Sequence, residues 1–404
     1  MARIIARFDA PARPSALVQV AAIYLVARVV TLTILFIGAS ASGPLSRFGA
    51  AATVGDFILG WDANWYWIVA DVGYPSDLPM TDDGRPMENA WAFMPVYAYL
   101  AKIVSLPFGS WVVGAAIVSL AAGFGASYAL YLLMRTRLTE TQSLWAVVFF
   151  ANGPLAALFH VGYAEALFLF FLLMALYVLV TRQFAWLYLL IPLMGYTRPG
   201  VLAFSLMLAL YGIWRWFRRR RDPLPLTHIN HIIAAGLLAA VVGLSWPVIA
   251  GIAMGDPTAY LQTELSWRRN WLPDSAPHFL PFDGWILGLN FWFGQWQIPA
   301  VLGWVLFGLL VAGTIWLLVR ARAVRALGME VRLFSASYLL YLVAVFFPQS
   351  STLRLLVPLA PLWGAPAQIK PLWGRIAVLV GCLIYQFIWI FEMYAYGNAI
   401  TRIP

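Results

Sequence analysis

The chain has 404 residues, of which 62% are hydrophobic and 11% are charged, and its mean hydropathy is +0.80. Because soluble domains usually carry about 25% charged residues, this composition excludes an ordinary soluble protein and indicates an all-α polytopic membrane protein. The net charge of +9 is carried mostly by short loops between apolar runs, so it does not indicate a nucleic-acid partner. Cys382 is the single cysteine and lies in an apolar run, which excludes a disulfide framework.

Apolar runs predict about 11 membrane-spanning helices, although several are short for a full crossing of roughly 20 residues. The expected spans are residues 15–37, 108–134, 142–159, 163–181, 184–197, 200–217, 231–254, 298–319, 333–347, 355–369 and 375–395. The runs 184–197, 333–347 and 355–369 are also compatible with re-entrant helices. We therefore expect one integral membrane domain over residues 1–404, without a soluble domain of any size.

The basic residues orient these spans, because cytoplasmic loops of membrane proteins carry an excess of Lys and Arg. With the N-terminus inside, every short basic loop falls on the cytoplasmic side, including the run Arg218–Arg221. Two long loops, residues 38–107 and 255–297, then share the outer side and carry most of the acids. The first of them is expected to carry helices that lie in the membrane interface.

The stretch Gly60–Pro75 in the first outer loop places two carboxylates among aromatic residues. Apolar side chains recur there at helical spacing and predict an interfacial helix with one apolar face: Trp61, Trp65, Ile68 and Val72. Asp62 stands at the start of this helix. It is either a general base that activates a hydroxyl for attack on a sugar carbon, or a helix N-cap. Asp71 falls on another face and is interpreted as a solvated loop acid.

A few arginines fall on the outer side, where the positive-inside bias does not explain them. Arg198 and Arg354 lie in short outer turns, and Arg268 and Arg269 lie in the second long loop. A guanidinium in such a place suits bidentate phosphate binding. The alternatives are snorkelling to the interface for Arg198 and anchoring to lipid headgroups for Arg268 and Arg269. Arg28 lies inside the first span and needs a partner that the sequence does not reveal.

A polar group occupies the very short outer turn between the third and fourth expected spans. It consists of His160, Tyr163 and Glu165. Ionisable residues near membrane depth are functional candidates, and the alternative is a hydrogen bond that holds the hairpin together.

The sequence lacks the common motifs for binding nucleotides, dinucleotides and metal ions. It contains no Walker-type phosphate loop, no dinucleotide fingerprint and no His/Cys cluster with metal-binding spacing, so we expect no cofactor and no metal. A cytoplasmic domain that could hold a nucleotide sugar is also absent. If the chain is a glycosyltransferase, its sugar must therefore come from a lipid-linked donor that arrives through the membrane.

Several separated segments together resemble the PIG-V type of membrane-embedded GT-C glycosyltransferases, the family of the second GPI mannosyltransferase and its bacterial relatives. The similar segments are Trp61–Asp62 with Trp65–Tyr66 and Gly73–Tyr74, Ala92–Pro95, Gly162–Phe168, Thr197–Gly200 and the turn Gln349–Arg354. They occur in the family's order and cover most of the chain.

The resemblance implies an inverting mannosyltransferase that uses polyprenyl- or dolichyl-phosphate mannose on the non-cytoplasmic side of the membrane, with a glycolipid or glycan acceptor. The composition and the short loops favour the outer face of a bacterial plasma membrane over the endoplasmic reticulum. Asp62 would be the catalytic base, and the donor's tail would lie in a groove between spans. The donor phosphate would be held by Arg354, Arg198 and Arg268, with support from Trp61, Tyr66, His160, Tyr163, Glu165 and Gln349. The alternatives are a GT-C enzyme for another lipid-linked sugar, such as arabinose, and a lipid or sugar transporter.

Overall fold

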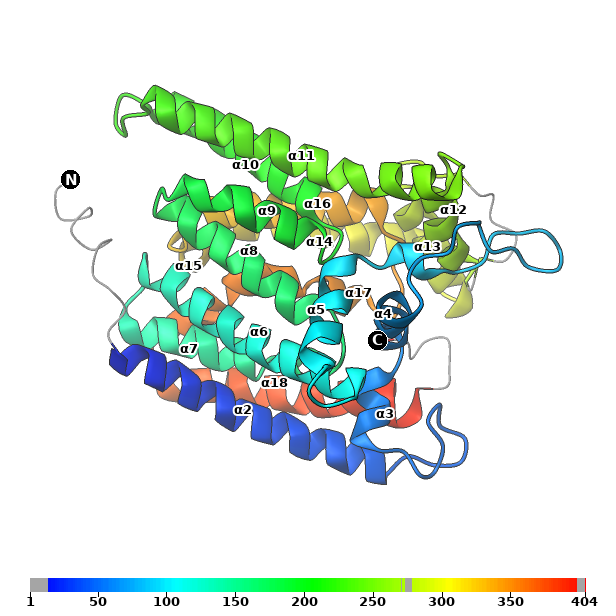
Figure 1. The fold of residues 1–404 in the computed structure, drawn as a ribbon. Coiled ribbons are helices and arrows are strands. Elements are labelled where there is room, and N and C mark those ends of the chain that lie inside the picture. Colours follow the sequence, from blue (N-terminus) through cyan, green and yellow to red (C-terminus); the bar gives the residue numbers. More distant parts are fainter. Residues whose placement is uncertain (1–13, 270, 273–277, 398–403) are drawn as a thin grey trace.

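The structure is a computed structural model that describes residues 14–269, 271–272, 278–397 and 404. Over these residues the regular structure is helical, and the only β-type pairing is an isolated bridge between Met80 and Pro86. Most helices run side by side as one bundle (Figure 1). Residues 1–13, on which the expectation of a cytoplasmic N-terminus partly depends, lie outside the described part.

Six of the described helices are long and apolar enough to cross a membrane, which makes the chain a polytopic membrane protein. They are α2 (Pro14–Ser40), α6 (Trp111–Arg135), α10 (Val201–Arg218), α11 (Leu226–Met254), α14 (Ala300–Arg320) and α18 (Leu372–Ile390), the last of which continues into the π-helical turn η6 (Phe391–Tyr396).

The predicted number of 11 spans is not confirmed, because several of the expected spans are short or broken. The shorter helices are α7 (Glu140–Ala151), α8 (Glu165–Val180), α9 (Leu187–Gly195) and α16 (Met329–Val345). The expected span 355–369 is instead a pair of 3₁₀ helices, η4 (Val357–Gly364) and η5 (Pro366–Gln368). Pro358, Pro361 and Pro366 each lack a backbone N–H, so an uninterrupted α-helix is disfavoured there.

The two long loops contain further helices. The first holds α3 (Val54–Leu59), α4 (Asp62–Asp71), η1 (Ala90–Ala92) and α5 (Pro95–Ser105), and the second holds α12 (Ala259–Arg268) and α13 (Asp283–Gln295). These helices gather at one end of the bundle, on the right in Figure 1, whereas the turn between α10 and α11 lies at the other end. Both long loops therefore meet on the same side of the molecule.

Burial differs strongly between the helices. Most side chains of α8 are buried, and this helix packs against α6 in the centre of the bundle. In contrast, α14 leaves nearly all of its apolar side chains exposed. Exposed apolar helix faces are expected where lipid rather than water surrounds the protein.

Candidate active site

Four charged side chains from distant parts of the sequence form one continuous cluster at the end where the long loops meet. Arg354 Nη2 lies 2.5 Å from Asp62 Oδ2, and Arg354 Nε lies 3.0 Å from Glu165 Oε1. Arg198 Nη1 lies 3.0 Å from the same Glu165 oxygen. We call Asp62, Glu165, Arg198 and Arg354 the charge cluster. It balances two carboxylates against two guanidinium groups, which allows ionised groups to be buried.

Asp62 is the most accessible member of the charge cluster. Its side chain is 25% exposed, compared with 4% for Glu165, 11% for Arg198 and 10% for Arg354. Among the described residues only its Oδ2 atom has a polar partner. The Oδ1 atom is therefore available to a ligand that enters from outside.

The alternative that Asp62 is a helix N-cap does not hold. The capping position of α4 is Trp61, whose side chain makes no capping hydrogen bond, and Asp62 is the first helical residue. The expected apolar face of α4 is also only partly right, because Val72 lies beyond the helix and is exposed. Trp61, Trp65 and Ile68 are half-buried against the core.

Glu165 is placed by the tight turn that precedes α8. The N–H of Gly162 donates a hydrogen bond to the carbonyl of Ile58 at 2.9 Å, so this turn lies directly against the segment that leads into α4. A Cβ at Gly162 would lie 3.0 Å from Ala63 Cβ and from the Ile58 carbonyl oxygen. Glycine thus permits the approach that brings Glu165 and Asp62 to the same site. As the first residue of α8, Glu165 also suits the positive end of the helix dipole.

Arg198 lies in the turn between α9 and α10. Gly200, two residues later, has a φ of +133°, a conformation that residues with a Cβ rarely adopt. Because Arg198 is mostly buried and paired with Glu165, it does not snorkel to the interface. The Thr197–Gly200 segment therefore directs a guanidinium into the charge cluster.

Arg354 lies in the short helix α17 (Thr352–Leu355), which follows a hydrogen-bonded turn. The N–H of Gln349 donates to Thr352 Oγ1 at 3.0 Å, and the Gln349 side chain donates to Ser351 Oγ at 3.0 Å. Gln349 thus stabilises the turn, and its side-chain hydrogen bond among the described residues goes to Ser351 rather than to the charge cluster. Burial alone would lower the pKa of Arg354, but the nearby Asp62 and Glu165 carboxylates together raise it above its usual value. Arg354 therefore stays positively charged.

Tyr163 and Tyr66 line the charge cluster. The guanidinium carbon of Arg354 lies 5.0 Å from the centre of the Tyr163 ring. Arg354 Nη1 is buried without a hydrogen-bond partner among the described residues. Tyr66 lies one helical turn after Asp62 in α4, and its pKa is raised mainly by burial and then by the charge of Glu165.

Trp61 precedes Asp62 with a φ of +55°, an uncommon conformation for a bulky residue. Its indole N–H donates to the carbonyl of Met393 at 3.2 Å, and Arg47 lies over its ring with the guanidinium carbon 3.8 Å from the centroid. The Trp61 side chain is therefore fixed by a hydrogen bond at its indole N–H and by the stacking of Arg47 on its ring. Sequence analysis did not single out Arg47, because it lies in a loop without a recognisable motif.

His160 lies apart from the charge cluster and contacts Arg28 instead. Arg28 Nη1 lies 3.2 Å from His160 Nδ1 and donates to the carbonyl of Ala156 at 2.7 Å. It also donates to the carbonyl of Ala151. These contacts supply the partner that Arg28 needs inside α2, and they favour the structural interpretation of His160.

The arginines of the second long loop are also apart from the charge cluster. Arg268 is buried and lies 3.4 Å from Asp283 at the start of α13, and Arg269 donates to the carbonyl of Pro86. Both side chains join loop segments. In the same helix as Arg268, burial raises the pKa of Glu264 to about 7, and Tyr260 acts on it in the opposite direction.

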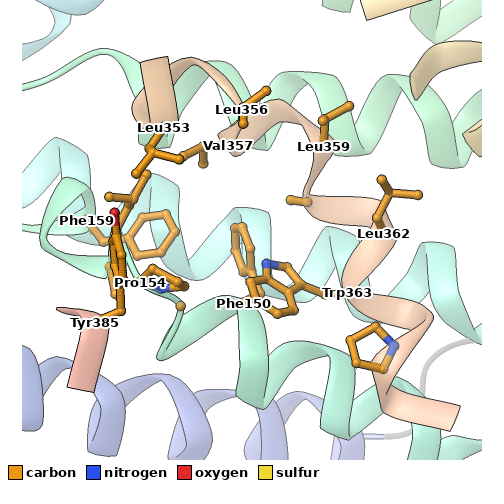
Figure 2. A pocket seen from close by; sticks show the side chains of 15 residues that line it. Phe150, Pro154, Phe159, Leu353, Leu356, Val357, Leu359, Leu362, Trp363 and Tyr385 are labelled. Atoms are coloured by element: carbon orange, nitrogen blue, oxygen red, sulfur yellow. The ribbon is translucent and has the colours of Figure 1, made fainter. Parts of the chain in front are cut away.

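An apolar groove includes Leu353, the residue that precedes Arg354, in its lining. It has a volume of about 530 Å³ and lies between the α7–η2 segment and the α17–η4 segment, with Tyr385 of α18 on its third side. Figure 2 shows Leu353 and Phe159 at one end of the groove and Trp363 towards the other. Because Leu353 directly precedes Arg354, this end of the groove lies at the short helix that carries Arg354.

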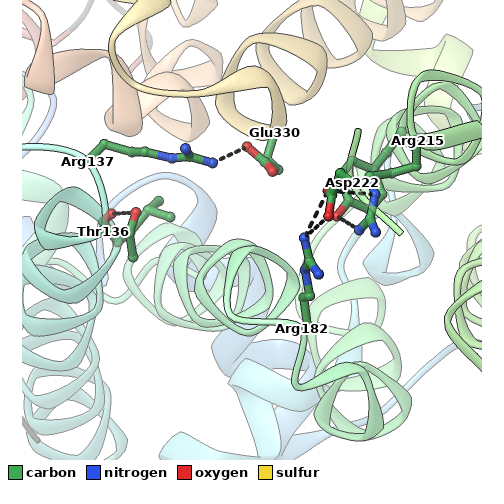
Figure 3. A network of polar contacts seen from close by, with 8 residues as sticks. Thr136, Arg137, Arg182, Arg215, Asp222 and Glu330 are labelled. Carbon is green, nitrogen blue, oxygen red and sulfur yellow. Dashed lines mark hydrogen bonds and ion pairs between the residues drawn. The ribbon is translucent and has the colours of Figure 1, made fainter. Parts of the chain in front are cut away.

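A second polar network ties the helices at the other end of the bundle (Figure 3). Arg182 lies 2.7 Å and Arg215 lies 3.3 Å from Asp222, and Arg137 lies 3.4 Å from Glu330. Helices α8 and α10 each run from the charge cluster to this network. Several loops that the sequence analysis assigned to the cytoplasm therefore lie together.

In the described part of the chain, no three His, Cys, Asp or Glu side chains come close enough to hold a metal ion. The expectation that no metal takes part remains a prediction.

No family model matches the chain, and no curated protein matches it. Among solved structures, it is similar to the Archaeoglobus fulgidus oligosaccharyltransferase in complex with Zn and sulfate, with 13% identity, a TM-score of 0.47 and coverage of 92% of this chain and 53% of that one. The apo form of that protein gives 14% identity, a TM-score of 0.45 and coverage of 92% and 56%. The Archaeoglobus fulgidus oligosaccharyltransferase AglB in complex with an inhibitory peptide and a dolichol-phosphate gives 11% identity and a TM-score of 0.43. That match covers 92% of this chain and 56% of the other. This chain thus spans little more than half of those chains, and likeness at this level establishes no activity.

Proposed function

We propose that this protein is a membrane-embedded glycosyltransferase of the GT-C type that transfers a sugar from a lipid-phosphate donor. The observation that carries this proposal is the position of Asp62. Its Oδ2 atom is held by Arg354 at 2.5 Å, while Oδ1 is open to a ligand. An oriented and accessible carboxylate suits a general base, and an apolar groove lined by Leu353, the residue before Arg354, suits a lipid-linked donor.

In the proposed reaction, Asp62 Oδ1 accepts the proton of the acceptor hydroxyl. The acceptor oxygen forms a bond to the anomeric carbon from the side opposite the lipid phosphate, and the bond between that carbon and the phosphate oxygen breaks. Its electron pair stays on the phosphate, so negative charge develops there. The configuration at the anomeric carbon is inverted.

The groove is proposed to hold the isoprenoid tail of the donor. It is lined by apolar side chains, it starts at Leu353, and its neighbour Arg354 belongs to the charge cluster. A tail in this groove would place the donor phosphate near the guanidinium groups. Arg354, with its unpaired Nη1 atom, is the best placed of the three arginines expected to bind phosphate. Arg198 and Arg268 are each occupied by a carboxylate.

Mannose is the proposed sugar, with polyprenyl-phosphate mannose as the donor and a glycolipid or glycan as the acceptor. This part of the proposal is supported by the sequence resemblance to PIG-V-type enzymes. We also propose that no metal is required, since guanidinium groups suffice to stabilise the leaving phosphate.

We place the site on the outer face of a bacterial plasma membrane, with the N-terminus in the cytoplasm. The positive-inside bias supports this orientation, because the basic loops at Arg137, Arg182 and Arg218–Arg221 follow helices that lead away from the charge cluster.

The direct test uses purified protein in lipid nanodiscs with labelled polyprenyl-phosphate mannose and a membrane lipid extract as the acceptor source. We expect a labelled glycolipid or glycan, or slow release of mannose to water. The same assay with polyprenyl-phosphate arabinose would identify the other sugar. Movement of intact donor across a sealed vesicle membrane, without any cleavage of either donor, would refute the enzyme and identify a transporter.

A further inference from the structure

Arg47, in the segment between α2 and α3, stacks on Trp61, the residue that precedes Asp62, and its positive charge has no ion-pair partner among the described residues. The side chain is exposed, and no carboxylate of the described residues lies within ion-pair distance of it. Its polar and ring contacts are a backbone hydrogen bond to the carbonyl of Tyr396 at 3.2 Å and the stack on Trp61.

This exposed side chain is nevertheless held in place. The Arg47 guanidinium carbon lies 3.8 Å from the centre of the Trp61 ring, and the opposite constraint on that ring is the hydrogen bond to Met393. An arginine stacked on an aromatic ring loses less freedom on binding a ligand than one that extends freely into water. Trp61 directly precedes Asp62, so the stack ties Arg47 to the residue next to the proposed base.

Tyr163 links Arg47 to the charge cluster. Burial lowers the pKa of Arg47, and the Tyr163 hydroxyl is close enough to act on it in the opposite direction. The Tyr163 ring also lies under Arg354 at 5.0 Å. Tyr163 thus contacts Arg354 and acts electrostatically on Arg47, and both guanidinium groups have donors that no carboxylate of the described chain uses.

The positive charge of Arg47 is available to bind an anion, because the other charges of the site balance one another. Asp62 and Glu165 balance Arg198 and Arg354 within the charge cluster. Together with Arg47, these described side chains sum to a formal charge of +1. A sugar phosphodiester carries one negative charge before the reaction, and the phosphate gains a second when the sugar leaves. A free guanidinium stabilises that added charge more than the ground state.

We propose that Arg47 binds the phosphate of the lipid-linked donor and stabilises the charge that develops when the sugar leaves, with Arg354 Nη1 as the second contact. This inference rests on the proposed function. It moves the principal phosphate contact from the paired arginines to a residue of the first long loop.

The test measures binding of sugar-free polyprenyl phosphate to the full-length protein in nanodiscs, together with KM and kcat for polyprenyl-phosphate mannose. Loss of a charge-assisted contact in Arg47→Gln should weaken phosphate binding about 10- to 100-fold. The KM for the donor should rise and kcat should fall. Arg47→Lys keeps the charge and should restore most of the affinity. In the matched control Arg85→Gln, a charge already paired with Asp83 at 2.8 Å is removed, and affinity should stay as in wild type.

Equal phosphate affinity of wild type and Arg47→Gln would overturn the inference. Equal losses in Arg47→Gln and Arg47→Lys, with a phosphate affinity that does not depend on salt, would indicate that Arg47 only supports Trp61 and would overturn it too. If the wild type transfers mannose and Arg47→Gln has the same phosphate affinity and transfer rate, the inference about Arg47 is refuted and the proposed function stands. If the wild type neither binds polyprenyl phosphate nor transfers sugar, the inference about Arg47 and the proposed function are both refuted.

Discussion

Glu165 is expected to hold the charge cluster together, and Glu165→Gln tests this. Its Oε1 atom lies 3.0 Å from both Arg198 and Arg354, and all three side chains are at most 11% exposed. Removing one partner of a buried ion pair typically costs about 3–5 kcal/mol, because the other charge remains buried and uncompensated. Arg354 keeps Asp62 as a partner, so most of the cost falls on Arg198.

The loss can be expressed as a shift in unfolding temperature. At about 2.1 cal/mol/K per residue, the unfolding entropy of 404 residues is roughly 0.85 kcal/mol/K, so Tm should fall by roughly 4–6 °C. Thermal unfolding in one lipid–detergent mixture would measure it. The matched control is Asp83→Asn, which removes a carboxylate from an ion pair more than half exposed on both sides and should leave Tm unchanged.

A double variant makes the prediction sharper. Arg198→Met alone should lower Tm, because Glu165 loses one of its two cations. In the Glu165→Gln background the same change should raise Tm, because the remaining pair of Asp62 and Arg354 is neutral. An effect of Arg198→Met with the same sign in both backgrounds would refute the charge-balance argument.

Three further predictions concern the surroundings of the site. Burial raises the pKa of Glu264 from 4.5 to about 7, so its contribution to stability is fully present below about pH 4.5 and is lost as pH rises through 7. Glu264→Gln should abolish this part of the pH dependence of Tm, roughly 3 kcal/mol at most; an unchanged Tm–pH profile would contradict it. Gly162→Val would place a Cβ 3.0 Å from Ala63 and displace the turn against α4. Its kcat should fall about tenfold or more, while Gly308→Val, which has open space around it, should be as active as wild type. Leu356→Trp would fill part of the groove and should raise KM for a long-chain donor but not for a short-chain one; equal changes for both would place the tail elsewhere.

The members of the charge cluster could be selected from the sequence, but their pairing could not. Alternating the expected spans across the membrane placed Asp62, Glu165, Arg198 and Arg354 in outer loops and turns next to helix ends. Ionisable residues in such places need partners. Which acid meets which arginine depends on how four distant turns approach one another. The close contact at Gly162 sets part of that approach, and a linear pattern of residues does not encode it.

Two other features show where reading the sequence fails. Hydropathy alone predicted a span at 355–369, but the prolines there favour short 3₁₀ helices. Arg47 was missed because it lies in a loop without a recognisable motif, and its stack on Trp61 is visible only in the folded chain. The roles of the individual site residues remain predictions.

The most direct measurement of the central claim is the initial rate of sugar transfer by Asp62→Asn, relative to wild type in the same nanodiscs. Asparagine keeps the shape of the side chain but cannot accept the proton of an acceptor hydroxyl. General-base catalysis is typically worth a factor of about 10²–10⁴, so we predict a rate at least 100-fold below wild type, with the affinity for polyprenyl phosphate preserved. A folded Asp62→Asn protein that transfers sugar within a few-fold of the wild-type rate would contradict the account.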